Sequence, residues 1–490
     1  MKILLCRPAY TPIYKLIKSK TGLKFVFPPM GLLYVAASLE QDGHEVEVID
    51  GEADDLTPEK MLQAVEKSKP DIVGAGATTV DFEYANALLK QVKEKLGIQT
   101  VIGGPHSTIM PTRVLEENPH IDFAVRGEGE ITARELVKEL AAGKNFSKVD
   151  GLSFRKGDKI VNNRERELIP DLDSLPRPAR RLVDQKKYLF PVPYRGMELV
   201  TEIQTSRGCP QKCVFCYRMF GMKLRLRSVK SVVDEIEYCV KELGVKFISF
   251  ADDTLTIVPK RLIEICDEII ARKIKVHWFG LSRADKLNEE IIKKMKSAGC
   301  VMMSIGVESG SQEILDSMKK GTTLEQCRES IRLLKKHGFV TRASFIMGLP
   351  GEDRRTLRKT IDFAKDLALD RAFFNIFTPY PGTPLFEMAE RGEGGVQLLT
   401  HNWKDFTRSG NAVINLGDID SEELMEWQKI AMMEFYARPR IIFNHLLEFI
   451  RGERAWYYYR PFFFGLKEFY KRKLRFWTRK SGAPSKKKSK

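Results

Sequence analysis

The stretch "TSRGCPQKCVFCYR" at residues 205–218 contains three cysteines, Cys209, Cys213 and Cys216, in the spacing C-x3-C-x2-C. It offers no fourth ligand, because the other cysteines fall in helix-like or strand-like segments and the next histidine is His277. A structural zinc site takes four ligands. A [4Fe–4S] cluster also normally takes four cysteines, so three would leave one iron open to a ligand from outside the chain. The spacing therefore favours a cluster with an open iron over structural zinc.

Six strand-like segments alternate with helical patterns after residue 200, and the cysteine loop follows the first of them. This alternation predicts a partial (β/α)6 barrel over residues 201–395, in which active groups gather at the carboxyl ends of the strands. Four further polar residues fall at such ends, namely Asp252, Asp253, Arg283 and Glu308. The predicted strands are residues 202–208, 246–252, 277–282, 302–309, 342–348 and 373–379.

Residues 1–145 alternate short apolar runs with helical patterns that end at glycine. The alternation predicts an α/β domain with a doubly wound parallel sheet, whose ligand lies beyond the carboxyl ends of the strands. Three motifs fall at that edge: "GATTVD", "GGPHST" and "RGEGE". The predicted strands are residues 2–6, 44–50, 71–77, 99–104 and 123–127.

Two segments remain. Residues 146–200 are rich in proline, which resists regular structure, and we expect a linker there. Residues 396–490 are expected to be a helical C-terminal extension with basic and aromatic residues. The net charge of +16 is concentrated there, because residues 431–490 hold 16 Lys and Arg against four Asp and Glu. Three interpretations stay open for this tail: packing on the barrel, stacking on RNA, or peripheral contact with a membrane through residues 431–490.

Composition is typical of a globular protein. The chain has 490 residues, of which 43% are hydrophobic and 30% charged. No apolar run of about 18 residues occurs, so no transmembrane helix is expected. The first residues lack the apolar segment of a signal peptide, and eight cysteines are too few for a disulfide scaffold. We therefore expect a cytoplasmic protein, with peripheral attachment to the cytoplasmic face of the membrane if the tail binds lipid.

The cysteine loop, with the aromatic Phe215 before its third cysteine, resembles the signature of the radical SAM superfamily. The resemblance implies a [4Fe–4S] cluster held by Cys209, Cys213 and Cys216, with S-adenosylmethionine (SAM) bound to the open iron. In that superfamily a reducing electron donor passes an electron to the cluster. SAM is then cleaved to a 5′-deoxyadenosyl radical, which removes hydrogen from an unactivated carbon.

Later segments resemble the same superfamily in the same order. "FADDTL" places Asp252 and Asp253 where the family contacts the methionine amino group of SAM. "LSRADKL" places Arg283 where a cation would meet the carboxylate, and "IGVESGSQEIL" places Glu308 opposite the ribose hydroxyls. "MGLPGED" and "TPYPGTPLF" are similar to the fifth and sixth strand exits.

The N-terminal half is similar to the cobalamin-binding sheet of one radical SAM subfamily. The resemblance implies that Gly103 and Gly104 let the backbone approach cobalamin and that Thr78 and Thr79 bond its nucleotide tail. Many cobalamin proteins carry D-x-H-x-x-G after the first strand, whose histidine ligates cobalt, and this chain has "CRPAYTPIY" there. His106, on another strand end, is the remaining candidate ligand, but we expect cobalamin to bind base-off between the sheet and the barrel mouth, without a protein histidine on cobalt. A sheet that has lost its cofactor is the alternative.

These resemblances imply a cobalamin-dependent radical SAM enzyme that acts on an unactivated C–H or C–C centre by methyl transfer, cyclisation or coupling. The substrate is expected to be a small molecule or a lipid. One alternative is an RNA-modifying radical SAM enzyme, but those with methylthiolating activity need a second three-cysteine cluster, and residues 1–200 contain only Cys6. A nucleic-acid partner is therefore not expected. A third class is a non-catalytic iron–sulfur or cobalamin sensor.

Overall fold

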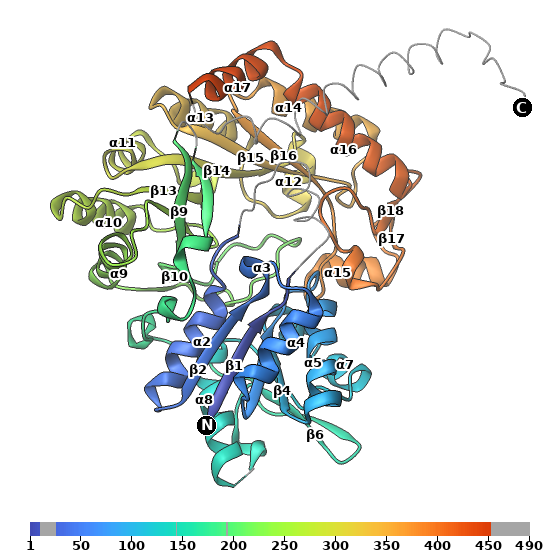
Figure 1. Ribbon diagram of the computed structural model, residues 1–490. Coiled ribbons are helices and arrows are strands. Elements are labelled where there is room, and N and C mark those ends of the chain that lie inside the picture. The colour runs from blue at the N-terminus through green and yellow to red at the C-terminus, as the bar shows by residue number, and fades with distance from the viewer. Residues whose placement is uncertain (10–25, 144, 193–194, 452–490) are drawn as a thin grey trace, which may run out of the picture.

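The computed structural model describes residues 1–9, 26–143, 145–192 and 195–451. Two sheets with their covering helices face each other across a central region, and the C-terminal helices lie beside the second sheet (Figure 1). The buried apolar side chains form a continuous cluster across both halves, which includes Leu4 and Val73 of the first sheet and Ile248 and Met303 of the second. The α/β class and the order of the two sheets are confirmed.

The first sheet has the strand order β2-β1-β3-β4-β5-β6-β7. Its first five strands are parallel, as the apolar runs predicted, and they are β1 (Lys2–Arg7), β2 (Glu45–Asp50), β3 (Ile72–Gly76), β4 (Gln99–Gly103) and β5 (Phe123–Val125). Helices flank both faces of this sheet (Figure 1). They are α2 (Met30–Gln41), α3 (Gly51–Asp54), α4 (Pro58–Ser68), α5 (Phe82–Leu96), α6 (Pro105–Ile109), α7 (Pro111–Glu117) and α8 (Gly129–Ala142).

The proline-rich segment 146–200 holds regular structure where a linker was expected. A hairpin of β6 (Leu152–Lys156) and β7 (Lys159–Asn162) extends the first sheet in antiparallel fashion. β8 (Leu189–Val192) pairs with β9 (Gly196–Ile203) and forms one edge of the second sheet. Proline at an edge position costs no ladder hydrogen bond that the sheet needs, and Pro191 lies in the edge strand β8. Short 3-10 turns join these strands: η1 (Phe146–Lys148), η2 (Leu172–Ser174), η3 (Arg180–Leu182) and η4 (Gln185–Lys187).

The second sheet is the open barrel, with the order β16-β15-β14-β13-β12-β9-β8. Its six parallel strands are β9, β12 (Phe247–Phe250), β13 (His277–Ser282), β14 (Cys300–Glu308), β15 (Val340–Met347) and β16 (Arg371–Ile376). The helices of this half are α9 (Val229–Lys241), α10 (Pro259–Ala271), α11 (Glu289–Ser297), α12 (Gln312–Ser317), α13 (Leu324–Lys336), α14 (Arg354–Asp366) and α15 (Pro384–Glu390), with η5 (Ala284–Lys286) after β13. The first barrel strand begins at Gly196, before the predicted start.

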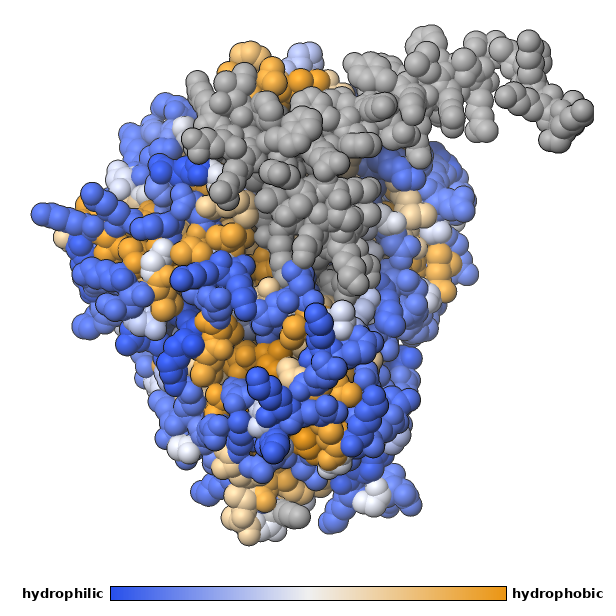
Figure 2. Space-filling view, in the orientation of Figure 1, coloured by the Kyte–Doolittle hydropathy of each residue, from blue (hydrophilic) through white to orange (hydrophobic). Residues whose placement is uncertain are grey.

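The C-terminal segment is not helical throughout. A small antiparallel pair, β17 (Val396–Leu398) and β18 (Ile414–Leu416), encloses η6 (Trp403–Asp405) and precedes α16 (Ser421–Tyr436) and α17 (Pro439–Arg451). The basic and aromatic residues 452–490 lie outside the described residues. In the part of the chain that is described, no helix combines the length and the apolar character needed to span a bilayer. The face shown in Figure 2 is mostly hydrophilic, with apolar patches between charged side chains.

Candidate active site

The cysteine loop is closed by backbone contacts at its base. β10 (Ser206–Arg207) pairs with β11 (Arg225–Leu226), and the Cys209 amide donates to the Gly221 carbonyl at 3.1 Å. Gly208 has φ of +89°, and a Cβ there would lie 2.3 Å from the Lys223 carbonyl oxygen. Only glycine fits such a position, so the loop can close here without displacing the facing strand.

The three loop thiols lie at different depths. Cys213 is buried, Cys209 is partly buried and Cys216 is exposed. Although the Cys216 residue is exposed, the protein around its sulfur desolvates the thiol and raises its pKa to about 11, and the neighbouring thiols Cys213 and Cys209 add to that rise. Within the described ranges, no three His, Cys, Asp or Glu side chains surround a single ion position. A four-iron cluster does not require that arrangement, because each thiolate binds a different iron, and the positive irons would stabilise the thiolates.

Asp252 and Asp253 follow β12 and have different environments. Asp252 is fully buried, and its Oδ1 accepts hydrogen bonds from the Thr205 hydroxyl at 2.9 Å and from the Ser206 hydroxyl. It therefore fastens the chain that leads into the cysteine loop. Asp253 is exposed, and its pKa is raised by desolvation and by the charge of Asp252.

Arg283 has one unused donor. Its Nε donates to Asp285 at 2.9 Å and its Nη2 to the Gly321 carbonyl at 3.1 Å. The buried Nη1 has no hydrogen-bond partner among the described residues. An unpaired buried donor is costly, and a carboxylate from a bound ligand would satisfy it.

Glu308 ends β14 with φ of +69°, an uncommon conformation for a residue with a side chain. Its carboxylate accepts from the Lys320 ammonium group at 2.6 Å. A Cβ at Gly306 would lie 2.3 Å from Glu308 Oε1, so that glycine leaves room for the carboxylate to fold back. Lys320, which sequence reasoning missed, lies 5.9 Å from the ring of Phe215 in the cysteine loop. The ion pair thus joins the fourth barrel strand to the cluster loop.

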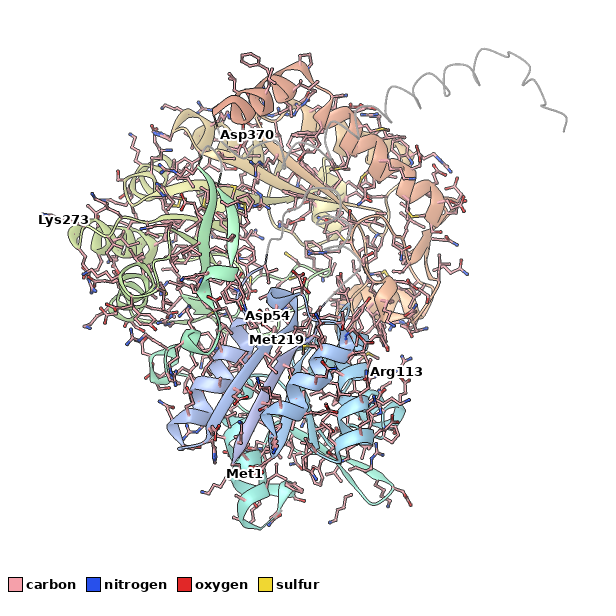
Figure 3. All side chains as sticks on the ribbon, viewed as in Figure 1. Met1, Asp54, Arg113, Met219, Lys273 and Asp370 are labelled. Atoms are coloured by element: carbon pink, nitrogen blue, oxygen red, sulfur yellow. The ribbon has the colours of Figure 1, made fainter. Side chains whose placement is uncertain are left out.

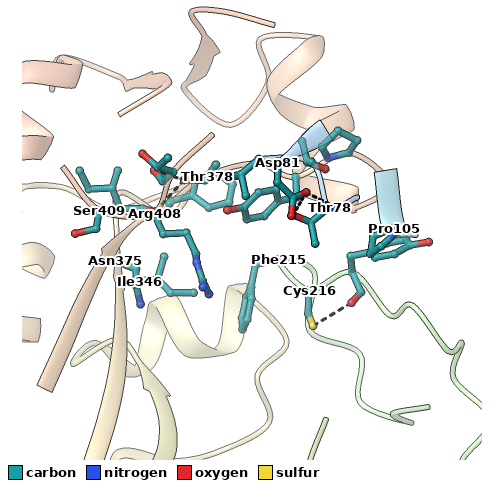
Figure 4. Close-up of a pocket in the computed structure, with 18 of the residues that line it drawn as sticks. Thr78, Asp81, Pro105, Phe215, Cys216, Ile346, Asn375, Thr378, Arg408 and Ser409 are labelled. Carbon is teal, nitrogen blue, oxygen red and sulfur yellow. Dashed lines mark hydrogen bonds between the residues drawn. The ribbon is translucent and has the colours of Figure 1, made fainter. Parts of the chain in front are cut away.

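Two cavities meet where the strand ends of the two sheets face each other. A cavity of about 860 Å³ is lined by Phe215, Cys216, Glu308 and Asn375 and by the first-sheet residue Thr79. Figure 4 shows Phe215 and Cys216 on one side and Thr78 and Asp81 on another. A second cavity of about 520 Å³ covers the carboxyl edge of the first sheet and extends to the cysteine loop. Arg7, Thr78, Asp81 and Pro105 line both cavities.

Of the residues predicted to hold cobalamin, Thr78, Gly103 and Gly104 line the second cavity and Thr79 does not. A Cβ on Gly104 would lie 2.6 Å from the Ala77 carbonyl oxygen, so this glycine is also required by the packing of two strand ends. Thr78 donates its amide and its hydroxyl to Asp81, and Thr79 lines the larger cavity only.

His106 does not reach either cavity. It is 1% exposed, its Nδ1 lies 3.3 Å from the Thr79 hydroxyl, and its ring packs against Phe82 and Trp403 at centroid distances of 4.3 and 5.2 Å. Burial lowers its pKa to about 4, so it is a neutral core histidine. His106 is thus not placed to ligate a cobalt ion in either cavity, and none of the described residues lining the second cavity is a histidine.

The "RGEGE" motif joins the two halves. Glu128 accepts from Arg207 at 2.8 Å and from Arg225 at 2.7 Å, and Glu130 accepts from Arg207 at 2.6 Å. All four side chains are buried. The arginines belong to the base of the cysteine loop, so the cluster loop is fixed to the first sheet by paired charges. Met219, which follows the third cysteine and is labelled in Figure 3, lines the second cavity.

Comparison with known families supports this division. The radical SAM superfamily model matches residues 203–364, and a B12 binding domain model matches residues 21–137. An uncharacterized methyltransferase of Pyrococcus horikoshii is 38% identical over 452 residues, which cover 91% of this chain and 95% of that protein. The chain belongs to the cobalamin-binding radical SAM enzymes. Its cofactors are therefore those of the family: a [4Fe–4S] cluster, SAM and cobalamin.

Other members of this family are similar over different lengths. An anaerobic magnesium-protoporphyrin IX monomethyl ester cyclase of Cereibacter sphaeroides is 38% identical over 74% of this chain and 60% of its own length. Among solved structures, the radical SAM methyltransferase TsrM of Kitasatospora setae, determined with tryptophan and a SAM analogue, superposes with a TM-score of 0.69 at 20% identity. That match covers 90% of this chain and 89% of TsrM, and it shows the shared fold.

The described residues fit the cofactors of this radical SAM family. The three loop thiols and the unpaired Arg283 Nη1 suit a cluster and the carboxylate of SAM. The second cavity offers a glycine-lined edge at Gly103 and a wide apolar wall, which includes Leu5, Val101 and Leu136. Sequence reasoning missed Asp81, Glu202, Lys320 and Arg408, because their meaning depends on what faces them across the cavities.

Proposed function

We propose that this radical SAM enzyme transfers a methyl group to an unactivated carbon of a small-molecule or lipid substrate. The observation that carries the proposal is the junction of the two cavities, which share Thr78 and Asp81, with Cys216 in the wall of the larger cavity. When bound, the cluster and SAM supply hydrogen abstraction and cobalamin supplies a methyl group. A substrate carbon held in the larger cavity would lie between Cys216 of the cysteine loop and the residues Thr78 and Asp81, which also line the second cavity.

The chain's own residues hold and enclose the reactants. Arg283 would bind the carboxylate of SAM through its free Nη1, and the Glu308–Lys320 pair fixes the strand end beside the cluster loop. Phe215, Ile346 and Phe377 give the larger cavity an apolar wall. Such a wall excludes water, which protects a reactive intermediate from side reactions.

Methyl transfer is preferred to ring closure because of the extent of similarity. The relative named a methyltransferase is 38% identical over 95% of its own length, whereas the cyclases are 38% identical over 60% of their length (Cereibacter sphaeroides) or 29% identical over 90% (Synechocystis). RNA modification has little support. The only cysteine among residues 1–200, Cys6, is fully buried in β1, and burial raises its pKa to about 12.

A lipid substrate and membrane attachment remain part of the proposal. α17 exposes Phe443 and Leu446, at 58% and 43% of their surface, and the sequence after it interleaves aromatic and basic residues. Such segments bind the interface of anionic bilayers. Radical chemistry suits the unactivated carbons of an alkyl chain, so docking at a bilayer would present a fitting substrate.

Cluster content and SAM cleavage test the proposed activity. Anaerobically reconstituted protein is expected to carry about four irons and four sulfides per chain, and to form 5′-deoxyadenosine with a low-potential reductant. The triple variant C209A/C213A/C216A should lose both properties. The control is Cys266→Ala, a buried thiol in α10 outside the loop, which should keep them. Full iron content in the triple variant would contradict the assignment. Mass analysis of metabolites and lipids after gene deletion would then identify the methylated product.

A further inference from the structure

Arg408 is a cation without a carboxylate partner in the wall of the larger cavity. Among the described residues that line this cavity, Arg7 and Arg408 are the only cations. Arg7 is paired with Asp50, at 2.8 Å from Nε to Oδ1 and 2.5 Å from Nη2 to Oδ2. The Arg408 side chain is exposed and forms no ion pair or hydrogen bond within the described structure. Its guanidinium group points towards Ile346 and Phe215 (Figure 4).

The backbone of Arg408 is held firmly, although its side chain is free. Its carbonyl oxygen accepts from the Ile376 amide at 2.9 Å and from Gln428 Nε2 at 3.2 Å. Gln428 is itself buried, donates to the Phe374 carbonyl at 2.7 Å and accepts from the Gly410 amide at 3.0 Å. The segment is thus fixed to β16 and α16, and a fixed backbone limits the entropy that Arg408 loses on binding a ligand.

The surroundings of Arg408 are suited to an amphiphilic ligand. Asn375 on β16 and Ser344 on β15 line the same cavity, and neither side chain forms a hydrogen bond within the described structure. Phe215 and Ile346 supply apolar surface between this polar end and Cys216. The volume of about 860 Å³ is near the upper end of the range of about 300–1,000 Å³ for ligand sites, so it has room for an amphiphilic small molecule.

We propose that Arg408, assisted by Asn375, binds an anionic group of the substrate, a carboxylate or a phosphoryl group, and directs the apolar part of that molecule towards Phe215 and Cys216. The inference rests on the proposed function, since it assigns a substrate class to the same site. Arginine presents a planar fork of donors that matches both oxyanions, and such charge-assisted bonds are the strong ones. The carboxylate of SAM has its own candidate in Arg283, so it does not account for Arg408.

Simple amphiphiles test this assignment on the holoenzyme, loaded with cluster, cobalamin and SAM. Octanoate, octyl phosphate and neutral 1-octanol would be titrated anaerobically at low salt by calorimetry. We expect at least one anion to bind about tenfold or more tightly than 1-octanol, and the tighter of the two identifies the oxyanion. Arg408→Gln should remove that preference and Arg408→Lys should keep part of it. The control is Arg355→Gln on α14, an arginine that is 67% exposed and lies outside both cavities.

A second variant covers the case in which Arg408→Gln loses its cofactors. Asn375→Asp leaves Arg408 in place but adds a negative charge to the same wall, and it should also abolish the preference for anions. The proposal is overturned if wild-type enzyme binds 1-octanol as tightly as both anions, or if Arg408→Gln or Asn375→Asp keeps the preference for the anion. Formation of 5′-deoxyadenosine is measured separately. Its absence would contradict the proposed function, whereas the binding preference decides the role of Arg408.

Discussion

At the scale of single residues, Glu202 shows how burial acts on a carboxylate beside the second cavity. It lies near the end of β9 and lines that cavity. Burial raises its pKa to about 7, and the charges of Arg7 and Arg180 offset only part of the effect. Because the pKa is raised in the folded state, the folded protein binds the proton more tightly than the unfolded chain. Stability is therefore lost as pH rises from about 4.5 to about 7.

Glu202→Gln should remove this loss. We expect the variant and the wild-type apoprotein to unfold at similar temperatures at pH 5. At pH 8 the variant should be more stable by on the order of 1–3 kcal/mol, because it no longer buries a charge. Thermal unfolding at both pH values checks the sign. The carboxylate infrared band lost in the variant should titrate near pH 7, and a midpoint near that of a free glutamate would contradict the assignment.

The sequence could predict the residues whose role depends on spacing, and it failed where the role depends on what faces a side chain. The loop of Cys209, Cys213 and Cys216 is one compact motif with a glycine at its base. The pair Asp252 and Asp253 gave no sign of which carboxylate turns inward, and the inward one is used by Thr205 and Ser206. An exposed arginine such as Arg408 is common in any sequence. Arg408 is informative because it lines a cavity and has no ion-pair partner among the described residues.

At the scale of elements, the base of the cysteine loop is tied to the first sheet by buried charge. The Glu128 carboxylate pairs with Arg207 and Arg225 and accepts a hydrogen bond from the Ile169 amide at 2.7 Å. Replacing one partner of a buried ion pair leaves an uncompensated charge, which costs about 3–5 kcal/mol. Glu128→Gln keeps the shape of the side chain and removes its charge.

We therefore expect Glu128→Gln to lower the free energy of unfolding by about 3 kcal/mol and to weaken retention of the cluster. Urea unfolding and iron content measure the two effects. The control is Glu117→Gln in α7, whose carboxylate is 54% exposed and pairs with Arg113 on the same helix. Such exposed pairs contribute about 0.5 kcal/mol or less. Equal losses in the two variants would show that the buried pairs do not fasten the loop.

The elements themselves were largely predictable where the pattern is long. The five parallel strands of the first sheet and the six of the barrel lie within a few residues of the apolar runs that predicted them. The hairpin β6–β7 and the pair β17–β18 were missed. These strands are three to five residues long, and their pairing is set by the neighbouring sheet or by each other across a loop. A short run beside prolines does not contain that information.

At the scale of the whole molecule, the two halves form one site because their strand ends face each other. The C-terminal segment completes the arrangement, since Trp403 packs on His106 of the first domain while Arg408 lines the cavity beside β16. The chain therefore encloses the cavities from three parts of the sequence that no local motif connects. The same segment leads through α16 and α17 to the basic tail.

Residues 452–490, outside the described structure, hold 13 Lys and Arg against two Asp and Glu, with aromatic residues among them. Each basic residue near an anionic surface contributes about 1 kcal/mol, and salt screens that attraction. Full-length protein should therefore co-sediment with phosphatidylserine-containing vesicles at low salt, be released at high salt, and ignore phosphatidylcholine vesicles. A chain ending at Arg451 should lose this binding. That end point removes none of the described residues and keeps Phe435 and Ile441, which are buried. If both chains bind equally poorly at low salt, the tail does not attach the enzyme to a membrane, and the proposal of a lipid substrate is no longer supported.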